Sequence, residues 1–194
     1  VTFEDGQGLD LSSLRIRVNG ADRTADFTRT TTEARATLAD AHPEGVNTIA
    51  VEIRDQASNL GAASSSFTLD VTAPSVTVRT PIANAFLNDP TPDVQIDLAD
   101  SLTGVEPTAT RIFVDDIDVT ADFSIGPTLA AGTLSNALSE GPHTLRVVTA
   151  DRAANPTVVE VVFVIDLTAP TMEMASPREG SFTNDPTPEI WLRT

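Results

Sequence analysis

The 194-residue chain carries 28 acidic residues against 12 basic ones, a net charge of −16, and it contains no cysteine. So negative a chain repels phosphate backbones, which excludes nucleic acid as a partner. The absence of cysteine excludes disulfides and thiolate metal sites. No apolar run approaches the roughly 18 residues of a membrane span, so we expect no membrane insertion of this segment.

Short stretches of alternating apolar and polar residues, separated by turn residues, predict β-strands along the chain. Asn19-Gly20 is typical of a hairpin turn, and Phe67 and Leu69 are expected to face inward from a later strand. The strands expected after residue 72 are marked by Val76 and Val78; by Val94, Ile96 and Leu98; by Arg111–Val114, which ends in an Asp115-Asp116 turn; by Leu145 and Val147; and by Val159, Val161, Phe163 and Ile165. About seven short strands in fewer than 100 residues predict an all-β, immunoglobulin-like sandwich.

The sequence also repeats itself at an offset of 96 residues without a gap. The repeated landmarks are Asp70–Pro74 with Asp166–Pro170, Asn88–Pro92 with Asn184–Pro188, Thr24–Phe27 with Thr120–Phe123, Asp55 with Asp151, Asn59 with Asn155, and Gly45 with Gly141. Such a period is typical of tandem domains. We therefore expect a repeat lacking its first two strands at 1–72, a complete repeat at 73–168, and the first two strands of a further repeat at 169–194.

The order of these motifs resembles the tandem bacterial Ig-like (Big-type) repeats of surface proteins and adhesins. The motifs are the Asn-Asp-x-Thr-Pro entry, the Asn-Gly or Asp-Asp turn, the Asp-x-Ala-x-Asn loop and the Asp-x-Thr-Ala-Pro linker. The resemblance covers essentially the whole chain. The usual Ala-Gly-Asn of the family is Ala-Ser-Asn at 57–59 and Ala-Ala-Asn at 153–155, so the turn type of that loop is open.

Calcium is the one ligand that the sequence suggests, because it binds clusters of carboxylate and amide oxygens on loops. The resemblance implies that the loop before the last strand faces the preceding repeat. Asp151 and Asn155 would then lie near Asp70, Asp100 and Glu106. The first repeat offers Asp55 and Asn59, together with Glu4, Asp5 and Asp10, but not the preceding linker. The alternative is that these residues only form Asx turns and loop caps.

Nothing in the sequence indicates catalysis. The two histidines, His42 and His143, are not related by the 96-residue offset, since the counterpart of His42 is Leu138. Lysine and cysteine nucleophiles are absent, and no phosphate-binding glycine loop occurs. The chain is therefore predicted not to be an enzyme. The outer face of the last strand is apolar at Val158, Val162 and Val164, which indicates either a contact surface or a strand covered by its neighbours.

The expected partners are neighbouring Ig-like repeats, because the repeats at both ends are incomplete. Either the sequence is a window of a longer array, or the segment 169–194 of one chain completes the repeat 1–72 of the next and builds a head-to-tail homopolymer. The predicted function is a structural or adhesive segment of an extracellular or cell-surface stalk, filament or sheath. The alternative is a noncatalytic accessory module of a large secreted enzyme, of a kind that binds carbohydrate.

Overall fold

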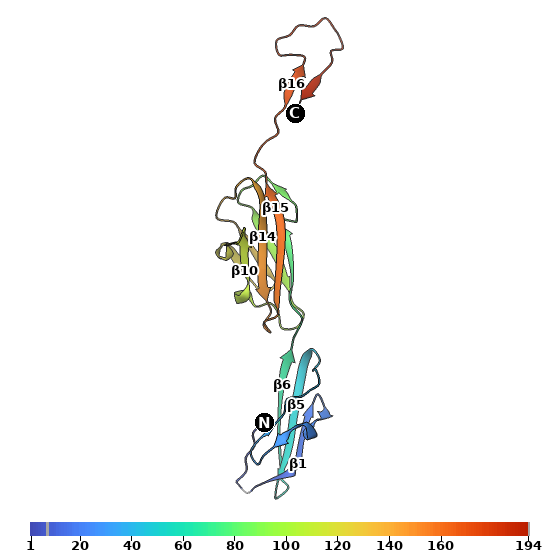
Figure 1. Ribbon diagram of the computed structural model, residues 1–194, viewed down its shortest axis with the longest axis vertical. Coiled ribbons are helices and arrows are strands. Elements are labelled where there is room, and N and C mark those ends of the chain that lie inside the picture. Colours follow the sequence, from blue (N-terminus) through green and yellow to red (C-terminus); the bar gives the residue numbers. More distant parts are fainter. Residues whose placement is uncertain (7, 194) are drawn as a thin grey trace.

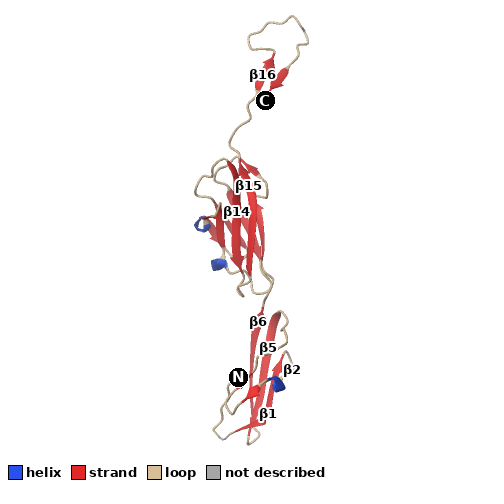
Figure 2. Cartoon of the chain, in the orientation of Figure 1, coloured by secondary structure: helices blue, strands red, loops and turns tan. Residues whose placement is uncertain are grey.

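The computed structural model describes residues 1–6 and 8–193, which form two β-rich units and a terminal hairpin along one long axis (Figure 1). Strands alternate with loops throughout (Figure 2), and the helical segments of the described residues are the short 3-10 turns Thr24–Asp26, Pro107–Ala109 and Thr120–Asp122. The strands of the first unit are β1 (Leu9–Val18), β2 (Ala21–Asp22), β3 (Thr28–Arg29), β4 (Ala34–Arg35), β5 (Gly45–Asp55) and β6 (Leu60–Leu69). Those of the second unit are β7 (Ser75–Thr80), β8 (Phe86–Leu87), β9 (Asp93–Ala99), β10 (Arg111–Val114), β11 (Ile117–Asp118), β12 (Phe123–Ile125), β13 (Leu129–Thr133), β14 (Gly141–Ala150) and β15 (Pro156–Ile165). The hairpin consists of β16 (Glu173–Ser176) and β17 (Trp191–Arg193).

The second unit is a two-layer sandwich. One sheet has the strand order β11-β10-β14-β15-β8 and the other has the order β12-β13-β9-β7. Most pairs are antiparallel, whereas β8 lies parallel to the end of β15. The two inner faces meet in one core cluster, in which β9 supplies Val94, Ile96 and Leu98 while β14 and β15 supply residues such as Leu145 and Phe163. The alternation seen in the sequence thus points every second side chain into this core, as in immunoglobulin-like domains.

The first unit has one main sheet instead of two. Its strand order, β2-β1-β5-β6, corresponds to β11-β10-β14-β15 of the second unit, and the separate pair β3-β4 corresponds to β12-β13. Its core cluster contains fewer buried residues: Leu14, Ile16, Ala34, Val51 and Ile53. Val1–Phe3 lie where the end of β9 lies in the second unit, and the backbone groups of Val1 pair with those of Ala34. The inner face of this sheet therefore lacks the strands that cover its counterpart.

The two units share local hydrogen bonds at positions 96 apart. Thr24 Oγ1 accepts a hydrogen bond from the backbone N–H of Ile16, and Thr120 Oγ1 accepts one from Ile112. The tight turns that precede these threonines also correspond. Asp115 and Asp116 both have positive φ values, 49° and 64°, as do Asn19 and Gly20. Both turns therefore have type I′ geometry, which suits the hairpin turns predicted at these positions.

Four short strands of the second unit were not predicted from the sequence: β8, β11, β12 and β13. β13 has the sequence Leu-Ala-Ala-Gly-Thr, which does not alternate between polar and apolar residues. A Cβ atom at Gly132 would lie 2.2 Å from the carbonyl oxygen of Asp122, so this strand approaches β12 too closely for a side chain. The first unit has Ala36 at the corresponding position, and there the pairing of β3 with β4 stops at Arg35.

Candidate metal site at the junction of the units

The linker between the units is held to the second unit through Asp70, which is 5% exposed. Its Oδ1 accepts a hydrogen bond from the backbone N–H of Thr72 at 3.1 Å. Its Oδ2 accepts hydrogen bonds from the backbone N–H and the hydroxyl of Thr103, at 3.1 and 2.6 Å. Because Thr103 belongs to the β9–β10 loop of the second unit, this one carboxylate joins the linker to the next sandwich.

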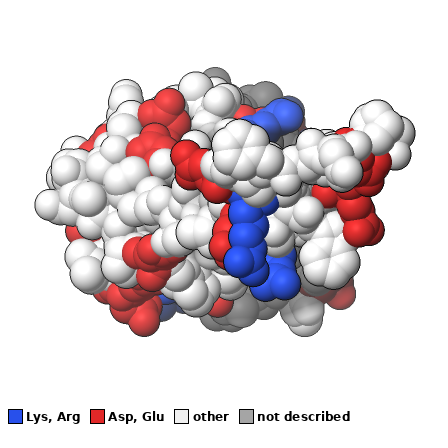
Figure 3. Space-filling view, turned by 90° about the horizontal axis from the view of Figure 1, so that it is seen from above, with Lys and Arg blue, Asp and Glu red and all other residues white. Residues whose placement is uncertain are grey.

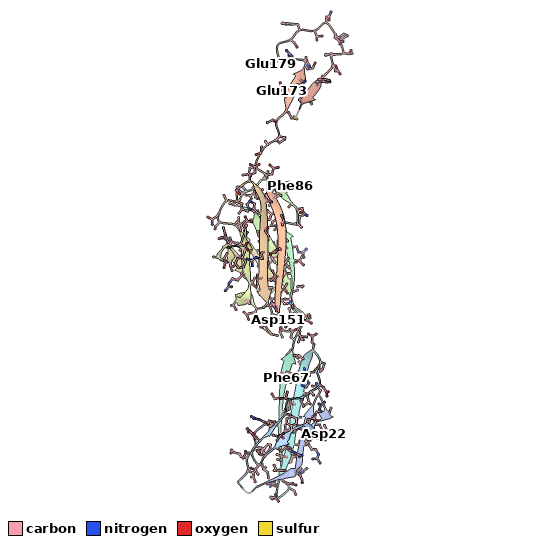
Figure 4. All side chains as sticks on the ribbon, viewed as in Figure 1. Asp22, Phe67, Phe86, Asp151, Glu173 and Glu179 are labelled. Atoms are coloured by element: carbon pink, nitrogen blue, oxygen red, sulfur yellow. The ribbon has the colours of Figure 1, made fainter. Side chains whose placement is uncertain are left out.

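Asp151 and Asn155 form the β14–β15 turn at the end of the second unit that faces the first (Figure 4). The carboxylate of Asp151, a residue only 2% exposed, accepts hydrogen bonds from the backbone N–H and the side-chain amide of Asn155, at 2.8 and 2.7 Å. The same amide group donates to the backbone carbonyl of Asp70 at 3.0 Å. Asn155 therefore fixes Asp151 and the linker in one arrangement.

Asp100 contributes a carboxylate from the loop that follows β9. Its Oδ2 accepts hydrogen bonds from the backbone N–H groups of Gly104 and Leu102, at 2.7 and 3.0 Å. These bonds lower the pKa of Asp100 below its ordinary value of 3.8, so the group is ionised at neutral pH. Its Oδ1 is buried and has no hydrogen-bond partner. A buried carboxylate oxygen without a partner is costly unless a cation or water supplies one.

Asp70, Asp100 and Asp151 each offer one carboxylate oxygen to a common point, and these oxygens lie within 4.8 Å of one another. Calcium binds oxygen at about 2.3–2.6 Å, so two ligands of one ion are at most about 5 Å apart. The spacing of the three carboxylate oxygens and the buried Oδ1 of Asp100, which has no hydrogen-bond partner, both fit a bound calcium ion. Carboxylate oxygens are also the hard donors that calcium prefers. The three carboxylates would supply part of the coordination shell and most of the compensating charge.

The other predicted ligand residues lie apart from this group. Glu106 turns its carboxylate to the backbone N–H and hydroxyl of Thr108, and so caps the 3-10 turn Pro107–Ala109. In the first unit, Asp10 is bonded to Ser12 in the same way. Asp55 and Asn59 repeat the hydrogen bonds of Asp151 and Asn155 at 2.8 and 2.7 Å.

The first unit has no counterpart of the three-carboxylate group among the described residues. Glu4 and Asp5 line a groove that also contains Asp55 and Asn59. The first unit thus shows the Asx-type turn by itself, without the converging carboxylates.

Sequence reasoning missed the residues that fix the linker. Glu44 accepts hydrogen bonds from the backbone N–H of Val71 and the hydroxyl of Thr72, both at 2.8 Å. The hydroxyl of Thr157 donates to the carbonyl of Pro74 at 2.6 Å. The sequence does contain a signal for the contact between Glu44 and Thr72, because both residue types recur 96 positions later. There Glu140 and Thr168 form the same hydrogen bond at 2.7 Å.

His143 is buried, and its geometry does not suit catalysis. Its Nδ1 pairs with Asp115 Oδ2 at 2.6 Å and its Nε2 with the carbonyl of Ser139 at 2.8 Å, so neither nitrogen is available to a substrate. Both partners are acceptors, which favours the protonated ring. Burial opposes the charge, but the bonds to Ser139 and Asp115 outweigh it and raise the pKa of His143 above 6.5.

This arrangement predicts a pH-dependent stability of the second unit. A raised folded-state pKa means that His143 stabilises fully below its unfolded value of 6.5, and that this contribution is lost as the pH rises through the folded-state pKa. We expect the free energy of unfolding to fall by about 1 kcal/mol between mildly acidic and alkaline pH. Urea unfolding at several pH values across this range measures the change in the free energy of unfolding. His143→Asn places at 143 the residue type that the first unit has at the corresponding position, Asn47. This variant should not lose stability as the pH rises. An equal dependence of the unfolding free energy on pH in both proteins would contradict the role given to His143.

The sequence of this junction matches a known family. The model of the bacterial Ig-like domain (group 3) matches residues 37–115, a range that begins in the first unit, crosses the linker and ends at the β10–β11 turn. The resemblance to bacterial Ig-like repeats is thereby confirmed. The match contains Asp70 and Asp100, whereas Asp151 lies beyond it. No curated protein is significantly similar to the chain. No described helix is long and apolar enough to cross a membrane.

Solved structures resemble this chain at low sequence identity. CopC from Methylosinus trichosporium OB3b is 15% identical with a TM-score of 0.35, covering 46% of this chain and 89% of CopC. Fibronectin(III)-like modules of CbhA from Clostridium thermocellum are 15% identical with a TM-score of 0.37, covering 84% of this chain and 82% of theirs. Dimeric latent PorU from Porphyromonas gingivalis is 18% identical with a TM-score of 0.42, covering 74% of this chain and 16% of PorU.

Proposed function

We propose that the chain is a noncatalytic spacer segment of an extracellular or surface protein, and that calcium stiffens the junction between its two units. The observation that carries the proposal is the meeting of Asp70, Asp100 and Asp151, one from the linker and two from loops of the second unit. A cation shared by these residues would fix the angle between neighbouring units. A spacer benefits from this because a stiff stalk projects its tip farther than a flexible one.

The partial carboxylate shell and the acidic composition of the chain both support a calcium site that works outside the cell. Extracellular calcium sites work at dissociation constants of about 10⁻⁴–10⁻³ M, which a partial carboxylate shell completed by water can reach. The net charge of −16 keeps such a chain soluble and attracts divalent cations. Seen along the long axis from the hairpin end, acidic side chains are spread over the outline of the molecule and arginines form smaller groups (Figure 3).

A calcium titration of the 194-residue chain tests the proposal. With a dissociation constant near 10⁻⁴ M, about 2 mM calcium should stabilise the second unit by about 1.8 kcal/mol. For a unit of this size, that shift raises Tm by about 7–14 °C. Calorimetry with calcium, with magnesium and after chelation measures the effect, and small-angle scattering measures the maximum dimension of the particle. Unchanged Tm and unchanged dimensions after chelation would overturn the proposal.

A further inference from the structure

We propose that the hairpin β16–β17 of one chain completes the open sandwich of the first unit of a second copy. The hairpin and the first unit lie at opposite ends of the long axis, so neither can reach the other within one molecule (Figure 1). The inference is independent of the calcium junction, which lies between the two units.

The first observation is the exposed inner face of the first unit. Phe67 in β6 is 40% exposed, whereas Phe163, 96 residues later in β15, is completely buried. Ile49 and Leu69 are likewise only partly buried, although their counterparts Leu145 and Ile165 are fully buried in the second unit. This face has the side chains of a sandwich core without the second layer that would cover them.

The second observation is the exposed apolar face of the hairpin. Met172, Met174, Ile190 and Leu192 are 60–74% exposed. They stand 96 residues after Val76, Val78, Val94 and Ile96, which form the inner side of β7 and β9 and pack into the core of the second unit. Two incomplete halves of one core are thus present in the same chain.

The hairpin already has the register that this position requires. In β16–β17, Met174 pairs with Leu192 and Ser176 with Trp191, with a register shift between the two pairs. In β7–β9, Val78 pairs with Ile96 and Thr80 with Gln95, with a shift at the same place. The hairpin therefore needs no rearrangement of its own strands before it docks, which reduces the entropic cost of binding.

The second unit shows where the hairpin would sit. There β9 pairs with β13, and Asp93 lies opposite Thr133, whose hydroxyl donates to the Asp93 carboxylate. The corresponding residues are Thr37 on the acceptor and Glu189 on the hairpin. The acceptor edge at 35–37 is exposed in the first unit. Val1 occupies the place opposite Ala34, so Leu192 of the incoming strand would displace it.

Cysteine cross-linking tests the proposed register, because the natural chain has no cysteine. A chain carrying Thr37→Cys and Glu189→Cys should form a ladder of disulfide-linked oligomers under mild oxidation, since residues opposite each other in antiparallel strands come within disulfide reach. A chain with Thr37→Cys and Glu179→Cys is the matched control, because Glu179 lies in the distal loop of the hairpin (Figure 4). A cross-linked monomer, equal ladders in both chains, or no ladder would each overturn the proposal.

Sedimentation of the unmodified chain gives an independent test. The average mass should rise with concentration, and Ile190→Asp with Leu192→Asp should weaken association at least 10-fold, since these side chains are exposed in the free chain and do not support its fold. Val158→Asp with Val162→Asp, which alters the exposed outer face of β15, should leave association unchanged. A strictly monomeric chain, or loss of association in the β15 variant instead, would contradict the inference. Asp100→Asn should not affect assembly, so this test is separate from that of the calcium junction.

Discussion

Phe163→Ala is expected to destabilise the second unit by about 3–5 kcal/mol, while Phe67→Ala costs the first unit about 1 kcal/mol. The two residues are 96 positions apart and belong to corresponding strands, β15 and β6. Phe163 is completely buried between two sheets, so its removal leaves a cavity that the surrounding core fills only in part. Phe67 is 40% exposed, and water already reaches the space beside it.

The comparison isolates the effect of the missing second layer because each phenylalanine also contacts a histidine. The ring of Phe163 lies 5.9 Å from that of His143, and the ring of Phe67 lies 5.7 Å from that of His42. The covering strands β7 and β9 are therefore the main difference between the two sites.

Hydrogen exchange of the β5 and β14 amides, measured at low protein concentration, assigns each loss of stability to its unit. Equal losses at the two positions would show that the first unit is closed. At concentrations where the hairpin of a second copy is bound, the cost of Phe67→Ala should rise toward that of Phe163→Ala.

The sequence predicted those parts of the fold in which one face of a strand is buried. Val94, Ile96 and Leu98 alternate with polar residues and form the buried side of β9, as expected. The short strands could not be predicted, because β8 and β11 contain two residues each and β13 is set by a close approach at Gly132. That approach depends on a backbone neighbour distant in sequence, which local patterns do not contain.

The candidate site was predicted in part. Asp70, Asp100 and Asp151 come together as the family resemblance implied, because the β14–β15 turn faces the linker. Glu106 does not join them: Thr108, two residues later, takes up its carboxylate. An acidic residue followed two positions later by serine or threonine tends to bond locally, as Asp10 does with Ser12. Asn155 acts through its amide N–H group, which orients Asp151 and holds the linker.

Asp100→Asn should change stability in opposite directions with and without calcium. Without the ion, three carboxylates face one another at up to 4.8 Å. At that distance, two like charges repel by about 1 kcal/mol in water and by more where solvent is partly excluded. The amide keeps an oxygen for the N–H groups of Gly104 and Leu102, and it brings an NH₂ group that can donate to a neighbouring carboxylate. We expect the calcium-free second unit to gain about 1 kcal/mol.

With about 2 mM calcium, the same variant should lose most of the stabilisation of about 1.8 kcal/mol that the ion gives the natural chain. The effect of Asp100→Asn on the unfolding free energy should therefore differ by about 2–3 kcal/mol between the calcium-free and the calcium-bound protein. This difference is larger than the effect of an ordinary surface substitution. Glu4→Gln is the matched control, since Glu4 stands 96 residues before Asp100 in a unit without the linker carboxylate. It should change stability by less than about 0.5 kcal/mol in either condition. Calorimetry of the three proteins decides the matter: if Asp100→Asn lowers stability equally with and without calcium, the carboxylate serves only to cap its loop.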